Sequence, residues 1–153
     1  MNHKLKFYYD PMVPPVSSQS VIQLKQPNYP HYLSFFTTQH PATKVNEWLK
    51  DYFEEQCHLR LAFGYFIKDQ WVGASDGPEM PYLPDFIQEI GINTLPDYRG
   101  PGYDQLVGTA CLQSILSSKK CPIWSCGLGN EPSRRLTSSI GFKKLAAVLT
   151  ISC

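Results

Sequence analysis

The segment that begins near residue 85 contains the feature that most restricts the fold. The apolar stretch Phe86–Ile92 (FIQEIGI) predicts a central strand, and the turn Arg99-Gly100-Pro101-Gly102 follows it. Apolar residues then recur at helical spacing, which predicts a helix that ends near Lys119-Lys120. A helix start offers unpaired N–H groups and partial positive charge, and glycines let an anion approach them. This order favours a loop that holds a diphosphate, although a plain turn is the competing interpretation.

Two better-known phosphate loops do not match this segment. A P-loop requires GxxxxGK[ST], and no lysine followed by a hydroxyl residue comes after Gly102. The dinucleotide fingerprint requires a third glycine within a parallel strand–helix–strand unit, whereas Asp104 and Gln105 stand near the place for that glycine. The preceding elements are also predicted as a hairpin. If the segment holds a diphosphate, it does so as a loop of another kind, and a plain turn stays the alternative.

The other segments predict helices and strands in alternation. Tyr29–Thr38 is ambiguous between a helix and a packed loop, and Thr43 is a plausible cap for a clearer helix over Val45 to Phe53. The expected strands are Ser20–Lys25, Leu59–Ile67, Trp71–Ser75, Pro122–Cys126 and Phe142–Ser152. A second clear helix is capped by Asn130 and ended by Gly141. The fold class is therefore α/β (α+β), with a mixed, mostly antiparallel sheet flanked by helices.

Length and charge exclude several classes of protein. A chain of 153 residues suits a single domain, 1–153, of which residues 1–42 are proline-rich and poorly assigned. The net charge of +1 comes without a basic stripe, which argues against a nucleic-acid partner. No apolar run reaches the ~20 residues of a membrane span, and the start lacks an apolar signal core, so we expect a cytoplasmic protein. Five cysteines without a CxxC pair indicate reduced thiols and no metal site.

Two stretches together resemble the GCN5-related N-acetyltransferases (the GNAT superfamily). They are EIGINTLPDYRGPGYDQLVGTACLQSIL and WSCGLGNEPSRRLTSSIGF, and they contain the Arg-x-x-Gly loop and the Asn-x-x-Ser…Gly-Phe helix in the family's order. The resemblance covers the acetyl-CoA-binding core, residues 86–142. It implies a sheet with splayed central strands, acetyl-CoA as cosubstrate, and transfer of the acetyl group to an amine.

The resemblance also assigns roles to individual residues. The backbone of Thr94 and Leu95 would pair with the pantetheine arm, and an N–H near Leu95 would hold the oxyanion. Residues 99–104 would wrap the diphosphate, mainly through N–H groups; they are Arg99, Gly100, Pro101, Gly102, Tyr103 and Asp104. Asn130 would bind the cofactor while capping its helix, or would act as a cap alone. Ser133 and Arg134 would lie at the rim of the cofactor.

The chain departs from the family pattern in three places. Asp104 stands where glycine or alanine is usual, so a carboxylate would either face the diphosphate or turn outward onto the helix start. Thr137 stands where the family has its tyrosine general acid, and a threonine hydroxyl is a poor proton donor. The sequence also ends after Phe142–Ser152, where the family has a further strand. An unpaired edge there would favour a homodimer through the C-terminal edge strand.

Glu89 is the candidate catalytic residue, because it is an acid in an otherwise apolar strand. Burial would raise its pKa and let it act as a general base through water. Pairing with a neighbouring Lys or Arg is the alternative. We therefore expect an acetyl-CoA-dependent N-acetyltransferase that acts on a small-molecule or peptide amine. The alternatives are a weak or inactive CoA-binding module and a structural domain that binds no CoA.

Overall fold

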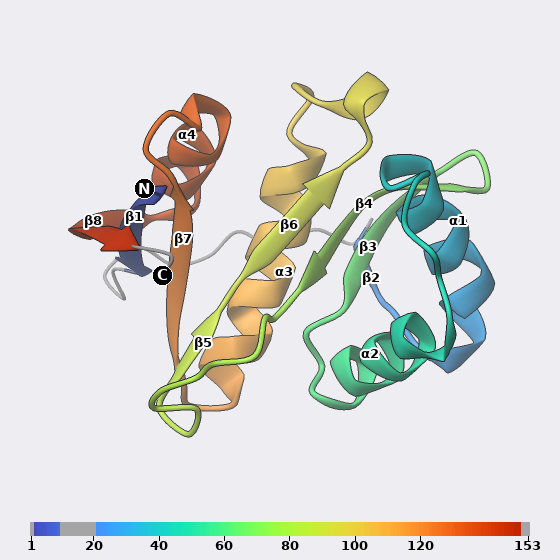
Figure 1. Ribbon diagram of the computed structural model, residues 1–153, viewed down its shortest axis with the longest axis horizontal. Coiled ribbons are helices and arrows are strands. Elements are labelled where there is room, and N and C mark those ends of the chain that lie inside the picture. The colour runs from blue at the N-terminus through green and yellow to red at the C-terminus, as the bar shows by residue number, and fades with distance from the viewer. Residues whose placement is uncertain (1, 10–20, 151–153) are drawn as a thin grey trace.

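The computed structural model describes residues 2–9 and 21–150, and the statements below refer to these residues. Ser20 and the end of the expected last strand lie outside them. Two four-stranded sheets form the centre of the molecule, in the orders β5-β7-β1-β8 and β2-β3-β4-β6 (Figure 1). Of the helices in this part of the chain, none combines the length and the apolar character that crossing a membrane requires.

The expected hairpin forms most of the second sheet. β3 (Phe63–Ile67) and β4 (Gln70–Asp76) pair antiparallel, and β2 (Val21–Gln23) adds to the outer edge of β3. β3 begins at Phe63 rather than Leu59, because the preceding helix extends further than expected. The Leu59 N–H donates to the Glu55 carbonyl at 2.8 Å, which makes Leu59 the C-cap of that helix.

The expected central strand Phe86–Ile92 is divided between the two sheets. β5 (Ile87–Glu89) pairs parallel with β7 (Cys121–Gly127), whereas β6 (Gly91–Thr94) pairs antiparallel with β4. Ile90 lies at the division and donates its N–H to the Ile123 carbonyl at 3.0 Å. β6 and β7 consequently diverge, as Figure 1 shows. This confirms the expected mixed sheet with splayed central strands.

The N-terminal strand was missed from the sequence, and it completes the first sheet. β1 (Asn2–Tyr9) lies between β7 and β8 (Phe142–Thr150) and pairs antiparallel with both. β8, the Gly-Phe strand, is thus paired with β1 on one side, and its other side is the edge of the sheet. Alternate residues of β1 point into the core, where Leu5, Phe7 and Tyr9 are buried.

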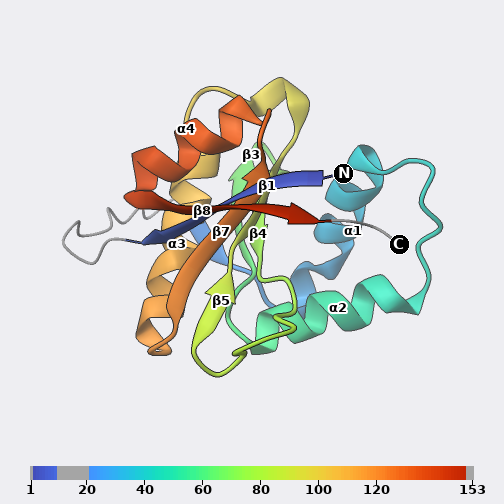
Figure 2. The same ribbon diagram turned by 60° about the vertical axis from the view of Figure 1, so that its left-hand side comes forward.

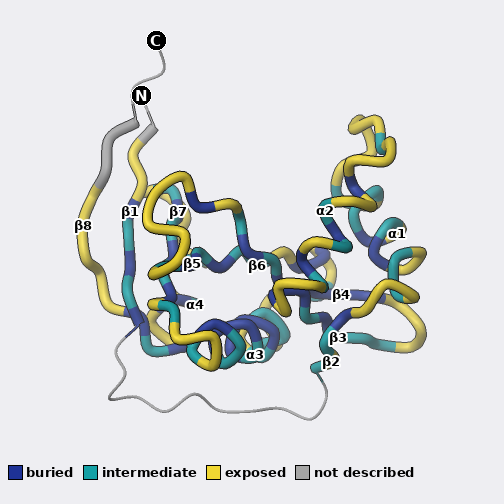
Figure 3. The backbone as a smooth tube through the Cα atoms, turned by 90° about the horizontal axis from the view of Figure 1, so that it is seen from below, coloured by how far each residue is buried: buried dark blue, intermediate teal, exposed yellow. Residues whose placement is uncertain are grey.

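The helices lie in two layers, and the layer of the first two helices covers only the sheet β2-β3-β4-β6 (Figures 2 and 3). α1 (Tyr29–Gln39) and α2 (Glu47–His58) lie on one face, and α3 (Tyr103–Ser117) and α4 (Glu131–Ile140) lie on the other. The ambiguous segment 29–38 is thus helical. α2 begins at Glu47 rather than at Thr43, because Asn46 is still extended and serves as its N-cap.

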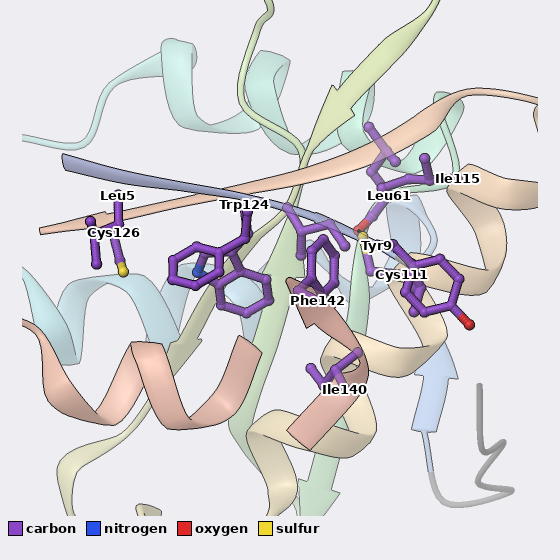
Figure 4. Close-up of a cluster of buried hydrophobic side chains, with 12 residues drawn as sticks. Leu5, Tyr9, Leu61, Cys111, Ile115, Trp124, Cys126, Ile140 and Phe142 are labelled. Carbon is purple, nitrogen blue, oxygen red and sulfur yellow. Dashed lines mark hydrogen bonds between the residues drawn. The ribbon is translucent and has the colours of Figure 1, made fainter. Parts of the chain in front are cut away.

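Two hydrophobic clusters hold these layers together. The larger one joins β1, β7 and β8 to α3 and α4, and Figure 4 shows Trp124 beside Phe142 within it. The smaller cluster joins α1 and α2 to β4, with Leu49 and Phe53 fully buried. The first cluster packs α3 and α4 against β1, β7 and β8, and the second packs α1 and α2 against β4.

Candidate active site

The glycine turn has the backbone conformation that a phosphate cradle needs. Gly100 and Gly102 have φ angles of 108° and 94°, a region that side chains rarely adopt. A Cβ atom built on either glycine would meet no other atom within 4 Å, so the space beside the backbone is open. Gly102 is the N-cap of α3 and has no side chain to occupy the first N–H groups of the helix. The loop therefore fits a bound diphosphate.

Asp104 uses one of these N–H groups itself. Its Oδ1 atom accepts the N–H of Gln105 at 2.8 Å, so the carboxylate folds back onto the helix start. The next backbone bond, from the Leu106 N–H to the Gly102 carbonyl, is already helical. The N–H groups of Gly100, Gly102, Tyr103 and Asp104, which the resemblance assigns to the diphosphate, donate to no backbone acceptor in the described part of the chain. The carboxylate close to them weakens the positive field of this helix end.

Three further loop residues support the turn. Arg99 donates from Nε to the Thr94 carbonyl at 3.2 Å, which ties the loop to the end of β6. Tyr103 packs its ring against Tyr65 of β3, with ring centroids 4.6 Å apart. Pro101 is exposed between the two glycines. These contacts hold the turn in place without filling it.

The free edge of β6 is the second part of the candidate site. The Leu95 N–H donates to the Val72 carbonyl at 2.9 Å, so Leu95 faces β4 and its N–H is not available for an oxyanion. Backbone groups alternate in an antiparallel pair, which places those of Ile92 and Thr94 on the opposite edge. Because β6 is the last strand of its sheet, this edge faces the divergence from β7.

The α4 residues have clear structural roles. Asn130 caps α4 as predicted, with its Oδ1 accepting the Ser133 N–H at 3.2 Å. The Ser133 hydroxyl accepts the indole N–H of Trp124 at 3.0 Å, and Arg134 pairs with Glu131 at 3.4 Å. Asn130 and Arg134 are exposed and Ser133 is half-buried. These bonds account for the residues within the protein, so their cofactor roles remain predictions.

Thr137 is closed off from any site. Its side chain is completely buried, and its hydroxyl donates to the Arg134 carbonyl of the preceding helical turn at 2.7 Å. A hydroxyl in this position cannot reach a leaving group. The sequence departs from the family pattern at this position, and the structure shows that Thr137 packs in the core there.

Glu89 is half-buried and has a basic neighbour. Its Oε2 atom lies 3.9 Å from Nζ of Lys6 on β1, and the same Nζ donates to the Ser125 hydroxyl at 2.6 Å. The alternative expectation for Glu89, a strand carboxylate paired with a neighbouring lysine, therefore describes what the structure shows. The lysine comes from the N-terminal strand, which the sequence pattern did not place.

A second carboxylate on the same side was missed from the sequence. Asp76 ends β4 and pairs with Gly91 of β6, and its Oδ2 accepts the Tyr52 hydroxyl at 2.6 Å. Burial raises the pKa of Asp76, the Tyr52 hydrogen bond lowers it, and the negative charge of Glu89 raises it. Strand alternation in WVGASD was the available signal, but it could not show that this acid lies beneath a helix.

The described residues contain no cluster of acids, histidines and cysteines suited to a metal ion. Four cysteines in that part of the chain are free thiols: Cys57, Cys111, Cys121 and Cys126. Burial raises the pKa of the Cys111 thiol to about 12, which makes it unreactive at neutral pH.

Comparisons with known proteins agree with this geometry. The family model for GNAT acetyltransferase matches residues 38–147, so the chain belongs to the GNAT acetyltransferase family. No curated protein matches the sequence.

Solved structures show the same fold at low sequence identity. A GNAT-family acetyltransferase from Colwellia psychrerythraea has a TM-score of 0.78 and 16% identity over 96% of this chain and 54% of its own. A second one, from Novosphingobium aromaticivorans, has a TM-score of 0.72 and 18% identity over 95% and 61%. The yncA protein of Salmonella typhimurium, solved with its cofactor acetyl-CoA, has a TM-score of 0.68 and 14% identity over 82% and 80%. The chain therefore spans a little over half the length of the first two.

Proposed function

We propose that this chain is an N-acetyltransferase that takes its acetyl group from acetyl-CoA. The observation that carries the proposal is the open glycine turn at the start of α3, next to the free edge of β6. Both lie within the part of the chain that matches the family. The yncA structure with acetyl-CoA supports the choice of cosubstrate. Residues 1–153 would form one acetyltransferase domain around this site.

Backbone groups would bind the cosubstrate. The N–H groups of Gly102, Tyr103 and Asp104 would hold the diphosphate, with Gly100 and Pro101 shaping the turn and Arg99 at its rim. The Thr94 N–H and the Ile92 carbonyl would pair with the pantetheine arm, in place of Leu95, because the Thr94 carbonyl already accepts from Arg99. Asn130, Ser133 and Arg134 are proposed to border the cofactor from α4. The Ile92 N–H, on the free edge, is the backbone donor that we propose for the oxyanion.

Acetyl-CoA supplies an activated thioester, whose carbonyl carbon the neutral amine attacks, so that the C–N bond forms, the C–S bond breaks and CoA leaves as its thiolate. A primary ammonium loses two protons in this reaction and keeps one in the amide; the first leaves before attack, and the second passes through water to the departed thiolate. An amine of ordinary pKa 10.4 needs about 4.6 kcal/mol to lose its first proton at pH 7. We propose that Glu89 takes this proton through water, with Lys6 fixing the carboxylate. The sealed Thr137 leaves the thiol to depart unassisted, at a cost of about 2 kcal/mol for a thiol of pKa 8.5.

A CoA-binding module without turnover is the second candidate. Two observations favour it, the buried hydroxyl of Thr137 and the Asp104 carboxylate at the helix start. A thiol-release assay with acetyl-CoA and a panel of amines separates the two functions. The acetyltransferase predicts thiol release that depends on an amine and is lost in Glu89→Gln. Cofactor binding without amine-dependent release across the panel supports the module.

The partners proposed for the chain follow from its surfaces. β8 is an edge strand and exposes two thirds of Leu145, which supports a homodimer through this edge. Near-neutral charge supports an amine acceptor of small size rather than a nucleic acid. The free thiols support a reducing, cytoplasmic location.

A further inference from the structure

A cavity of about 240 Å³ opens on the face of the sheet opposite α3. Its walls come from α1 and α2, and its floor consists of residues of β4 and β6, among them Asp76 and Asn93. Asn93 lies on β6 between Ile92 and Thr94, whose backbone groups face the proposed cofactor edge. A molecule in the cavity would therefore lie beside the thioester. The small volume excludes drug-sized ligands, whose pockets span about 300–1,000 Å³.

The walls of the cavity are mainly aromatic. Phe36 and Trp48 meet edge to face with centroids 5.7 Å apart, and Tyr32 lies deeper, beside them in the lining. Trp48 is 45% exposed although it is a large apolar side chain, so part of its ring is free for a ligand. Such walls bind a flat apolar body, and they also attract a cation through their ring faces.

The floor offers a single acidic group, whose ionised form a bound ammonium would favour. Asp76 is the one acid among the residues that line the cavity, all of which belong to the described part of the chain. Tyr52, which also lines the cavity, donates its hydroxyl to Oδ2 of Asp76 and fixes the carboxylate in position. One fixed carboxylate matches one ammonium group. Polyamines and polycationic sugars would bring further charges for which the lining holds no second acid.

We propose that this cavity is the acceptor site, and that it takes a small monoamine whose ammonium group pairs with Asp76 and whose apolar, ring-bearing body packs against the touching pair Phe36 and Trp48. The inference depends on the proposed acetyl transfer and specifies its substrate class. Asp76 is a binding residue that positions the nitrogen next to the thioester. Glu89 does not line the cavity, so a water molecule would carry the proton from the bound nitrogen to it, as proposed above.

Phenethylamine is the probe, because it combines one ammonium with one ring. We expect it to bind in the presence of CoA, measured by calorimetry, and to support thiol release from acetyl-CoA. 2-Phenylethanol lacks the charge, propylamine lacks the ring and spermidine carries several charges, and each should bind more weakly. A charge-assisted hydrogen bond contributes about 1.5–3 kcal/mol, so 2-phenylethanol should bind about 10- to 150-fold more weakly than phenethylamine.

Asp76→Asn should remove the preference for phenethylamine over 2-phenylethanol and leave acetyl-CoA binding unchanged. Asp51→Asn, on the exposed surface of α2, is the matched control and should change neither. If acetyl-CoA fails to bind the wild-type protein, the proposed function is wrong. If acetyl-CoA binds but spermidine or an alanine-initiated peptide is preferred to phenethylamine, or Asp76→Asn keeps the preference, only the substrate class proposed here is wrong.

Discussion

Replacing Gly102 by alanine separates the cost of the left-handed backbone from the cost of lost ligand contact. Gly102 has a φ angle of 94°, and a Cβ atom there would touch nothing in the free protein. A non-glycine residue in this region costs about 1–2 kcal/mol. For a domain of this size that loss lowers Tm by about 2–8 °C. The variant should therefore fold, with a modest decrease in its free energy of unfolding.

The affinity for acetyl-CoA should fall by much more than the stability suggests. The backbone strain is present with and without ligand, so it cancels in the binding equilibrium unless the turn rearranges. The methyl group, however, would stand in the open space before the helix N–H groups. Losing one charge-assisted hydrogen bond to the diphosphate costs about 1.5–3 kcal/mol, which raises Kd about 10- to 150-fold.

Calorimetric titration with acetyl-CoA and thermal melts measure the two effects separately. Gly129→Ala is the control, because a Cβ atom there also meets nothing within 4 Å and the φ angle of Gly129 is ordinary. It should change neither Kd nor Tm appreciably. An unchanged Kd in Gly102→Ala, or an equal loss in Gly129→Ala, would refute the assignment of the glycine turn as the diphosphate cradle.

Three further changes test other parts of the structure. Thr137→Val should leave the rate of thiol release within about twofold, because the buried hydroxyl bonds only to the Arg134 carbonyl; a large decrease in kcat would contradict this. Leu5→Ala should lower the free energy of unfolding by about 2–5 kcal/mol in urea titrations, because Leu5 is 1% exposed within β1; a neutral result would mean that β1 adds little to the sheet. Asp76→Asn should be more stable than wild type near pH 7, with the difference shrinking toward pH 4. The pKa of Asp76 is raised in the folded protein, so folded Asp76 stays protonated to a higher pH than unfolded Asp76, whose pKa has the ordinary value of 3.8. Wild-type stability therefore falls as the pH rises above 3.8, and urea midpoints measured across pH check this sign.

The parts of the site that depend on neighbouring residues in sequence were predictable. Asn130 caps the start of α4 by a local hydrogen bond, and Gly141 ends the helix with a left-handed backbone conformation. The glycine turn before α3 was likewise visible, because its chemistry lies within a few residues. Local propensities and caps act over one or two turns, and the sequence shows them directly.

The parts that depend on distant pairing were not predictable. β1 lies between strands more than a hundred residues away, and nothing within NHKLKFYY specifies those partners. The division of the central strand at Ile90 likewise depends on which half meets β7 and which meets β4. Asp76 was missed for the same reason, since its enclosure by Tyr52 depends on how α2 packs over β4.

A structure of the protein with acetyl-CoA bound tests the central proposal most directly. We expect the diphosphate within hydrogen-bond distance of the N–H groups of Gly102, Tyr103 and Asp104, and the pantetheine arm along the free edge of β6 beside Ile92 and Thr94. The acetyl carbon should then face the cavity that contains Asp76. Density for the coenzyme elsewhere on the protein, with the glycine turn free of it, would contradict the account.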